Sequence, residues 1–445
     1  MNSYPSYKDS GVEWLGDIPN DWDSIRLKYI GFLYGGLSGK SGKDFNDDGN
    51  PNNKPFIPFT NISDNTYISR DNLGKVNISE DDKQNRVKQF DLFFLMSSED
   101  QEGIGKPSVL KEELGEVYLN TFCRGFSITD EKYDSLFVNY LLSGHSYREL
   151  LSVEGRGFTR INLRSHKVSN FQIYYPPKET QTQIVSFLDT KTNKIDELIE
   201  KTQQKIELLK EKRTSLINHC VTKGLNPDVE MKDSGVEWIG EIPSHWETSQ
   251  IKFVTQLFRG KFSHRPRNDQ RFYNGEYPFI QTGDIVSSGK YLTNYTQTLN
   301  EKGYSVSKEF PLNTLVMTIS GNIGDVSILK IKSCFPDSII GFFPFKNTSV
   351  DFLYFVFSSL KNEFYKNSTI STQMNLNIER VGSIKVPLLP KSEQTKIVEY
   401  LDEQTQKIDS TIEKETQRTE LLKEYRQSLI SEVVTGKVDV RNYNG

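Results

Sequence analysis

An internal duplication constrains the fold of this chain more than any other feature of its sequence. The segment at residues 9–30, DSGVEWLGDIPNDWDSIRLKYI, returns at residues 233–254 as DSGVEWIGEIPSHWETSQIKFV, and 11 of the 22 aligned positions are identical without a gap. Residues 177–222 return at 390–435 with 27 of 46 positions identical, again without a gap. The chain therefore consists of two related halves.

The stretches that lie between the repeated segments are much less alike. Their remaining echoes are short, and they pair Pro55-Phe56-Ile57 with Pro278-Phe279-Ile280, Gly103-Ile104-Gly105 with Asn322-Ile323-Gly324, and Asn162-Leu163 with Asn375-Leu376. The two modules therefore share one fold but carry different surfaces, whereas the repeated segments that flank them remain similar in sequence. Selection for different targets on a shared frame would produce this pattern.

Both copies of the longer repeat are predicted to be long helices, because each follows a proline stop and then shows apolar residues at alternating spacings of three and four over about five heptads. We expect the two helices to pair with each other, since each then finds a matching seam in the same chain. The alternative is that each packs only within one domain. The expected seam consists of Leu188, Ile195, Ile199, Ile206, Leu209, Leu216, Leu401, Ile408, Ile412, Leu422 and Leu429.

The modules between the helices contain short β-rich runs, such as PFIPFTNI and TLVMTIS, broken by Gly, Asn and Asp turns. Amphipathic helices are expected near the end of each module. The predicted class is α+β, with module 1 at residues 1–177, helix 1 at 178–224, module 2 at 225–390 and helix 2 at 391–445. The two mixed modules alternate with the two long helices.

The bulk composition is that of a globular protein that works in a reducing compartment. The 445 residues are 35% hydrophobic and 26% charged, with a net charge of −4. No apolar run approaches the ~20 residues that span a bilayer, and the beginning of the sequence does not resemble a signal peptide. Cys123, Cys220 and Cys334 lie far apart, which favours the cytoplasm and gives no zinc spacing.

The search for catalytic motifs indicates a chain without catalytic groups or metal ligands of its own. Residues 35–41, GGLSGKS, nearly form a phosphate-binding loop, but Tyr34 stands where the first glycine is required. A glycine-rich surface loop is the simpler interpretation. The five histidines show neither metal-ligand spacing nor an obvious nucleophile to activate.

Local clusters of basic residues point to nucleic acid. Arg259, Lys261, Arg265, Arg267 and Arg271 face a single acidic residue, Asp269, within thirteen positions, with aromatic residues interleaved. A second candidate is the glycine-containing stretch EGRGFTR at residues 154–160, whose counterpart at 368–375 is STISTQMN. Solvated loops have similar compositions, so these clusters are candidates on residue type alone.

The repeated segments DSGVEW-[LI]-G-[DE]-IP…W and P-K…QT…IV…LD…KID…IEK…ELLKE…R.SLI resemble the specificity subunits (HsdS) of type I restriction–modification systems. The resemblance covers both halves and essentially the whole chain. The family's helix begins with Pro-x-x-Glu-Gln; here the second copy keeps Glu393-Gln394, whereas the first has Thr180-Gln181.

The resemblance implies that each module is a target recognition domain that reads one half of a bipartite DNA site. The helices would form an antiparallel coiled coil that sets the half-site spacing and helps to dock two methyltransferase subunits. Two motor–nuclease subunits would complete the restriction complex, and S-adenosylmethionine, ATP and magnesium would belong to those partners. The DNA-facing residues it suggests are Arg156, Thr159 and Arg160 in module 1 and Ser320, Asn322, Ser371, Thr372 and Gln373 in module 2; Arg265 and Arg267 join them from the basic cluster.

Two other functions are weighed against this one. A self-sufficient restriction enzyme or methyltransferase is disfavoured, because no nuclease or cofactor motif remains after both halves are accounted for. A coiled-coil scaffold that binds no DNA is disfavoured by the divergence of the modules between similar helices. The DNA sequence recognised is not derivable from these residues.

Overall fold

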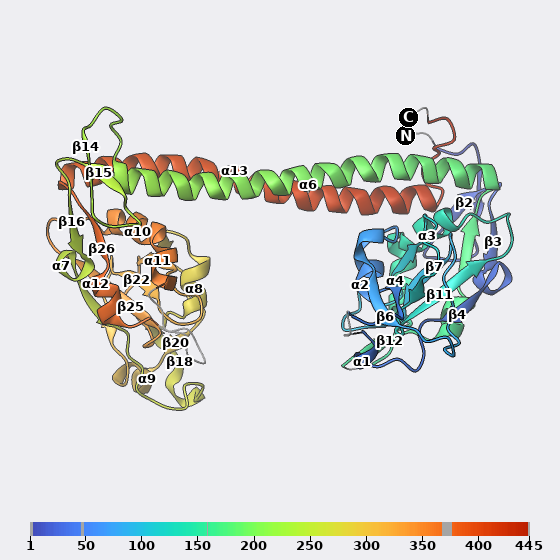
Figure 1. The fold of residues 1–445 in the computed structure, drawn as a ribbon, viewed down its shortest axis with the longest axis horizontal. Coiled ribbons are helices and arrows are strands. Elements are labelled where there is room, and N and C mark those ends of the chain that lie inside the picture. Colours follow the sequence, from blue (N-terminus) through green and yellow to red (C-terminus); the bar gives the residue numbers. More distant parts are fainter. Residues whose placement is uncertain (1–2, 46–48, 158, 367–375, 444–445) are drawn as a thin grey trace. The chain divides into compact units, whose positions relative to one another are not determined.

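The computed structural model describes residues 3–45, 49–157, 159–366 and 376–443. It divides into two compact units (Figure 1). Unit 1 contains residues Met1–Gln203 and Gln417–Gly445, and unit 2 contains Gln204–Thr416. Unit 1 therefore joins module 1 to the first part of one long helix and the last part of the other. Unit 2 joins module 2 to the two complementary parts.

The two long helices are α6 (Lys178–Lys223, 46 residues) and α13 (Lys391–Val434, 44 residues). Neither contains glycine or proline, and each begins directly after a proline. Gly224 and Gly436 follow their ends with φ of +76° and +74°, a conformation that favours glycine and stops a helix. The second helix therefore ends at Val434, and residues 435–443 continue as turns.

Pairs of charged side chains join α6 to α13 within each unit, and the two pairs of unit 2 show that the helices run antiparallel there. In unit 2, Lys205 pairs with Glu415 at 2.5 Å, and eight residues later Arg213 pairs with Asp409 at 2.8 Å. In unit 1, Arg426 pairs with Asp196 at 2.8 Å. The expected pairing of the two helices is confirmed, and the alternative in which each helix packs only within one domain is wrong, because each contributes to both units.

The central sheet of module 1 has four antiparallel strands in the order β4-β11-β7-β9, from Gly31–Gly35, Cys123–Ile128, Leu92–Leu95 and Pro107–Val109. A second, three-stranded sheet has the order β10-β5-β6. The other elements of module 1 are β1 (Tyr7–Asp9), β2 (Asp17–Pro19), β3 (Asp23–Arg26), a 3-10 helix at Leu27–Tyr29, α1 (Gly42–Phe45), β5 (Asn53–Ile57), α2 (Phe59–Asp64), a 3-10 helix at Arg70–Asn72, β6 (Gly74–Asn77), β8 (Ser97–Ser98), β10 (Tyr118–Leu119), α3 (Ser135–Ser143), α4 (His145–Val153), β12 (Ile161–Asn162), α5 (Ser165–Ser169) and β13 (Gln172–Tyr175).

Module 2 repeats this central sheet and adds a fifth strand. The order is β17-β25-β22-β23-β19, from Thr255–Arg259, Ile339–Pro344, Leu315–Thr318, Val326–Leu329 and Tyr291–Leu292. Its other elements are β14 (Met231–Asp233), β15 (Glu241–Pro243), β16 (Glu247–Gln250), α7 (Ile251–Val254), a 3-10 helix at Gln270–Phe272, β18 (Tyr273–Pro278), α8 (Thr282–Ser287), β20 (Thr298–Leu299), α9 (Glu301–Ser305), β21 (Glu309–Phe310), β24 (Ser333–Cys334), α10 (Val350–Ser359), α11 (Lys361–Lys366), α12 (Ile378–Ser383) and β26 (Lys385–Leu388). The α+β class and the internal repeat are therefore confirmed.

The main core of each unit joins the sheet, the module's helices and the two long helices. In unit 1 it includes Trp22, Phe137 and Leu188, together with Leu429 and Val433 from α13. In unit 2 the corresponding core includes Trp246, Phe352, Leu401 and Val221. Because one continuous core spans each module and its helices, the helices position the modules' loops.

Candidate nucleic-acid interface

The loop at residues 154–162 in unit 1 is held in shape by its own backbone. The main chains of Arg156 and Asn162 exchange two hydrogen bonds of 2.9 and 3.0 Å. Gly157 has φ of +150°, and a Cβ there would lie 1.8 Å from the carbonyl oxygen of Arg160, so the turn requires glycine. The guanidinium of Arg156 donates to the carbonyl oxygens of Val153 at 2.6 Å and Gly155 at 3.1 Å. Arg156 and Thr159 are exposed.

Strand pairing brings this loop against the turn that follows β7. Residues Ile161 and Asn162 of β12 pair with Ser98 and Ser97 of β8. The side-chain amide of Gln101 also donates to the carbonyl oxygen of Ser152 at 2.5 Å. The loop at residues 154–162 and the turn that follows β7 therefore form one surface.

Arg160 lies on this surface beside an aromatic residue that the sequence analysis did not single out. Its guanidinium carbon lies 5.0 Å from the centroid of the Phe122 ring, and a terminal nitrogen lies 3.8 Å from the Glu99 carboxylate. Both Arg160 and Phe122 are exposed. An exposed arginine next to an exposed ring offers both a phosphate contact and a stacking face.

In unit 2 the matching turn follows β22. Gly321 has φ of +75°, Ser320 is half-buried and Asn322 is exposed. The Asn322 carbonyl accepts a hydrogen bond from the Thr318 hydroxyl, which fixes the turn. Ser371, Thr372 and Gln373 lie outside the described residues.

The same backbone contact places the leucine of the Asn-Leu motif in both modules. The amide of Leu163 donates to the carbonyl oxygen of Met96 at 2.9 Å, and the amide of Leu376 donates to that of Ile319 at 3.1 Å. Leu163 and Leu376 therefore occupy equivalent places beside the strand that precedes each turn. The two modules present loops of common architecture and different side chains.

The basic cluster of module 2 is held by an acidic residue distant in sequence. Asp337 pairs with Arg265 at 3.4 Å and with Arg267, and its carbonyl oxygen accepts from Arg259 Nε at 2.6 Å. Arg271 and Asp269 pair at 2.6 Å, and the hydrogen bonds from Arg271 hold the pKa of Asp269 well below its usual range.

The five basic residues of this cluster thus meet two carboxylates, and a positive excess remains. Arg265 and Arg267 are exposed, and both already form an ion pair with the Asp337 carboxylate. A phosphate that approaches them would compete with Asp337 rather than meet free side chains.

Every predicted seam residue is buried or half-buried. Leu188, Ile195, Leu401, Ile408 and Leu429 are buried, whereas Ile199, Ile206, Leu209, Leu216, Ile412 and Leu422 are half-buried. The neighbouring leucines Leu208 and Leu421 are each 64% exposed and occupy the same position of the repeat.

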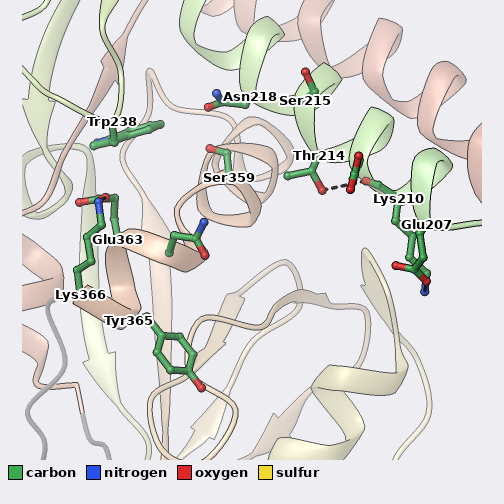
Figure 2. Close-up of a pocket in the computed structure, with 12 residues that line it drawn as sticks. Glu207, Lys210, Thr214, Ser215, Asn218, Trp238, Ser359, Glu363, Tyr365 and Lys366 are labelled. Atoms are coloured by element: carbon green, nitrogen blue, oxygen red, sulfur yellow. Dashed lines mark hydrogen bonds and ion pairs between the residues drawn. The ribbon is translucent and has the colours of Figure 1, made fainter. Parts of the chain in front are cut away.

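A wide cavity of about 1000 Å³ in unit 2 does not coincide with the candidate residues. Figure 2 shows it between α6, which contributes Glu207, Lys210 and Thr214, and the end of α10 and α11, which contribute Ser359 and Glu363. None of the predicted DNA-binding residues that the structure describes lines it, and its carboxylates and amines are mixed.

Two searches for other kinds of site were negative within the part of the chain that the structure describes. No group of three or more His, Cys, Asp or Glu side chains is placed to hold a metal ion. No helix there is long and apolar enough to cross a membrane.

The family model described as "Type I restriction modification DNA specificity domain" matches the chain twice, at residues 19–208 and 243–423. The putative type I restriction enzyme MjaX specificity subunit of Methanocaldococcus jannaschii is 24% identical over 444 residues, which cover 96% of each chain. The EcoKI specificity subunit of Escherichia coli is 25% identical over 208 residues, 45% of this chain and 44% of that protein.

Solved structures show the same fold. A chain from the work "Structural basis underlying complex assembly and conformational transition of the type I R-M system" superimposes with a TM-score of 0.74 at 15% identity, covering 95% of this chain and 99% of that one. The HsdS subunit of Thermoanaerobacter tengcongensis gives a TM-score of 0.52 at 15% identity, with 95% and 98% covered. With the family model matched in both halves, the chain belongs to the DNA specificity subunits of type I restriction–modification systems, the non-catalytic components that recognise DNA.

Proposed function

We propose that each module reads one half of a bipartite DNA site, and that α6 and α13 set the distance between the half-sites. The observation that carries this proposal is the repetition of one loop architecture with different side chains. Module 1 offers Arg156, Thr159 and Arg160, and module 2 offers Ser320 and Asn322, in modules where Leu163 and Leu376 make equivalent backbone contacts. A shared frame with unlike side chains suits two unlike half-sites.

The physical advantage of this arrangement is tethering. Each module alone would bury a modest surface and bind weakly, whereas a tether turns the second contact into an intramolecular event. Similar faces then meet successive major-groove surfaces about one helical turn apart. Two methyltransferase subunits dock on the chain, and two motor–nuclease subunits complete the complex in the cytoplasm. S-adenosylmethionine, ATP and magnesium are held by those partners.

The decisive experiment maps methylated adenines across the genome of a strain that carries this chain with its methyltransferase partner. We expect one bipartite motif with a fixed gap between its two halves. Exchange of module 2 for that of another specificity subunit should alter one half of the motif and leave the other unchanged. A motif that stays whole after the exchange contradicts the proposal.

The role of the helices is tested by inserting seven residues in both at the boundary between the units. The insertions go between Gln203 and Gln204 and between Thr416 and Gln417. One heptad adds about 10.5 Å of helix, equivalent to about three base pairs. The gap in the methylation motif should lengthen accordingly. An insertion in α6 alone is the control, because it breaks the pairing of Lys205 with Glu415 and of Arg213 with Asp409. If the gap in the motif is unchanged after the matched insertions in both helices, the helices do not set the spacing.

The basic cluster is tested with Arg267→Ala in the assembled methyltransferase. If Arg267 lies on a phosphate, affinity falls equally for all DNA sequences, and the slope of log affinity against log salt concentration becomes shallower by about 0.9. Lys407→Ala is the matched control, since it also removes one exposed cation, on α13, where it pairs with Glu403. If the two changes alter DNA affinity and its salt dependence equally, Arg267 does not lie in the DNA interface.

The rival assignment, an enzyme complete in one chain, has its own test. The purified chain is incubated with labelled S-adenosylmethionine and mixed-sequence DNA, with the assembled methyltransferase as the positive control. We expect label on the DNA only in the assembled complex.

A further inference from the structure

A polar cavity of about 780 Å³ lies within unit 1, between module 1 and the two long helices. The end of α2 and the start of β9 form one side, α3 and α4 form another, and α6 and α13 close it. It is distinct from the loop at residues 154–162, since no residue of that loop within the described ranges lines it. The charged residues of its lining are Asp64, Lys106, Arg148, Asp196, Lys423 and Arg426.

Arg148 contributes a buried cation that lacks an anionic partner. Its Nη2 donates to the carbonyl oxygens of Glu102 at 2.7 Å and Ile104 at 2.8 Å. Its Nη1 is buried and has no hydrogen-bond partner among the described residues. Burial lowers the pKa of this guanidinium to about 10, which shows how little nearby negative charge offsets its desolvation.

Lys106 brings a second cation into the same cavity. Its ammonium group donates to the carbonyl oxygen of Ser63 and forms no ion pair with a described carboxylate. Burial lowers the pKa of Lys106, and the positive charge of Arg148 lowers it further. Both cations line one cavity, and the charge of Arg148 makes Lys106 harder to protonate.

The remaining charges of the lining do not cancel this excess. Arg426 is paired with Asp196 at 2.8 Å, and Lys423 is paired with Glu420 at 2.8 Å. With Arg426 and Lys423 paired in this way, Lys106 and Arg148 remain against the single carboxylate of Asp64. Burying unpaired charge is expensive, so an excess of this kind calls for an anion.

Module 2 lacks this excess at the corresponding place. The glycine that ends the turn is Gly105 in module 1, where it faces Arg148, and Gly324 in module 2, where it faces Lys361 and Phe364. The next residue is Lys106 in module 1 but Asp325 in module 2, and Asp325 pairs with Lys361 at 2.6 Å. The same position thus holds two cations in one module and a neutral pair in the other.

We propose that the cavity of unit 1 binds a phosphate group between Arg148 and Lys106. The guanidinium of Arg148 donates to one phosphate oxygen, and the free donors of the Lys106 ammonium group donate to another. A phosphate carries up to two negative charges and several acceptor oxygens, which matches two cations approaching from different elements. The group comes either from the DNA backbone or from free phosphate.

The binding test uses the full chain and inorganic phosphate, followed by calorimetric titration and by the shift in unfolding temperature. We expect saturable binding, and Arg148→Met should weaken it at least tenfold, about 1.4 kcal/mol. Because Arg148 also supports the turn at residues 102–105, Lys106→Met provides a second variant, and Arg148→Lys should restore part of the affinity. Lys361→Met is the matched control in unit 2 and should bind phosphate as the unchanged chain does. Absence of saturable binding, or full binding by both methionine variants in unit 1, overturns the proposal.

A second arm identifies the source of the phosphate. In the assembled methyltransferase, a loss of duplex affinity in Arg148→Met that is equal for all sequences, with a shallower salt slope, assigns the site to the DNA backbone. If Arg148→Met loses phosphate binding but keeps its affinity for duplex DNA, the site is assigned to free phosphate. Both results support the site. The titration needs no DNA, so its failure is distinguishable from failure of the bipartite reading, which the methylation map tests.

Discussion

The guanidinium of Arg426 donates two hydrogen bonds to the carboxylate of Asp196, at 2.8 and 3.1 Å. The equivalent residues of the repeat are Arg213 and Asp409, whose Nε and Oδ1 atoms also lie 2.8 Å apart. Each pair joins the C-terminal part of one long helix to the N-terminal part of the other. The same contact is therefore made once in unit 1 and once in unit 2.

The two arginine–aspartate pairs should contribute nearly equal coupling energies. Double-mutant cycles with alanine at Arg426 and Asp196, and at Arg213 and Asp409, should each give about 0.5 kcal/mol, because both pairs are partly exposed. Denaturant unfolding, resolved into the transitions of the two units, measures them. If the two coupling energies differ by more than about 1 kcal/mol, the two copies of the pair are not energetically equivalent.

The buried seam leucines should matter far more than exposed leucines of the same helices. Leu188→Ala and Leu401→Ala each remove a fully buried side chain, and each should destabilise its unit by about 2–5 kcal/mol. Leu208→Ala and Leu421→Ala are the controls, since these side chains are 64% exposed, and they should change stability by about 0.5 kcal/mol or less. Thermal unfolding distinguishes the two classes.

A single substitution should supply a missing hydrogen bond in unit 1. The buried indole of Trp246 donates to the Glu393 carboxylate at 2.9 Å, whereas the equivalent Trp22 Nε1 has no partner among the described residues. The position that matches Glu393 is Thr180. Thr180→Gln should stabilise unit 1 by about 1 kcal/mol by offering an acceptor.

An amide is chosen for this substitution because Asp21 precedes Trp22 where His245 precedes Trp246. A new carboxylate would meet Asp21 as a like charge. Thr180→Val is the control without an acceptor, and Glu393→Thr should destabilise unit 2. Unfolding followed by tryptophan fluorescence reports both; equal stabilities of the glutamine and valine variants would refute the missing bond.

The three cysteines should stay unreactive in the folded chain. Burial raises the pKa of Cys123 to about 12 and those of Cys220 and Cys334 to about 11. At pH 8 the thiolate fraction of Cys123 is therefore about one in ten thousand, so iodoacetamide should label it only after unfolding. Mass spectrometry with and without denaturant counts the modified thiols.

The same pKa shifts set the sign of a pH effect on stability. Above about pH 9 the unfolded chain releases thiol protons that the folded chain retains. The folded state then binds more protons, so stability falls as pH rises through this range. Replacement of Cys123 by alanine should flatten the fall, and an unchanged slope would mean that this thiol is not protected.

The helices were predictable from sequence because their signal is local and periodic. Proline entries, the heptad spacing and a duplicated register predict where both helices begin and that they pair, whereas the second helix ends at Val434 and not at residue 445. The class of the modules followed from short alternating runs between turns. The order of the strands did not, because the pairing of β11 with β4 and β7 depends on contacts across the whole module.

The candidate interface was only partly predictable, because its electrostatics depend on residues that meet through the fold. Asp337 lies 70 residues from Arg267 in sequence, yet it holds that guanidinium. Phe122 meets Arg160, and Arg148 meets the turn that contains Lys106, for the same reason. Composition identified the arginines, whereas their partners needed the structure.

The split of unit 1 into two stretches of chain has a consequence for synthesis on the ribosome. Unit 2 is continuous from Gln204 to Thr416, whereas the core of unit 1 joins Trp22 to Val434 and Val440. At about 5–20 residues per second, Trp22 waits on the order of 20–80 s for those partners. All of unit 2 is made before that wait ends. The unit that is begun first is therefore the last to be completed.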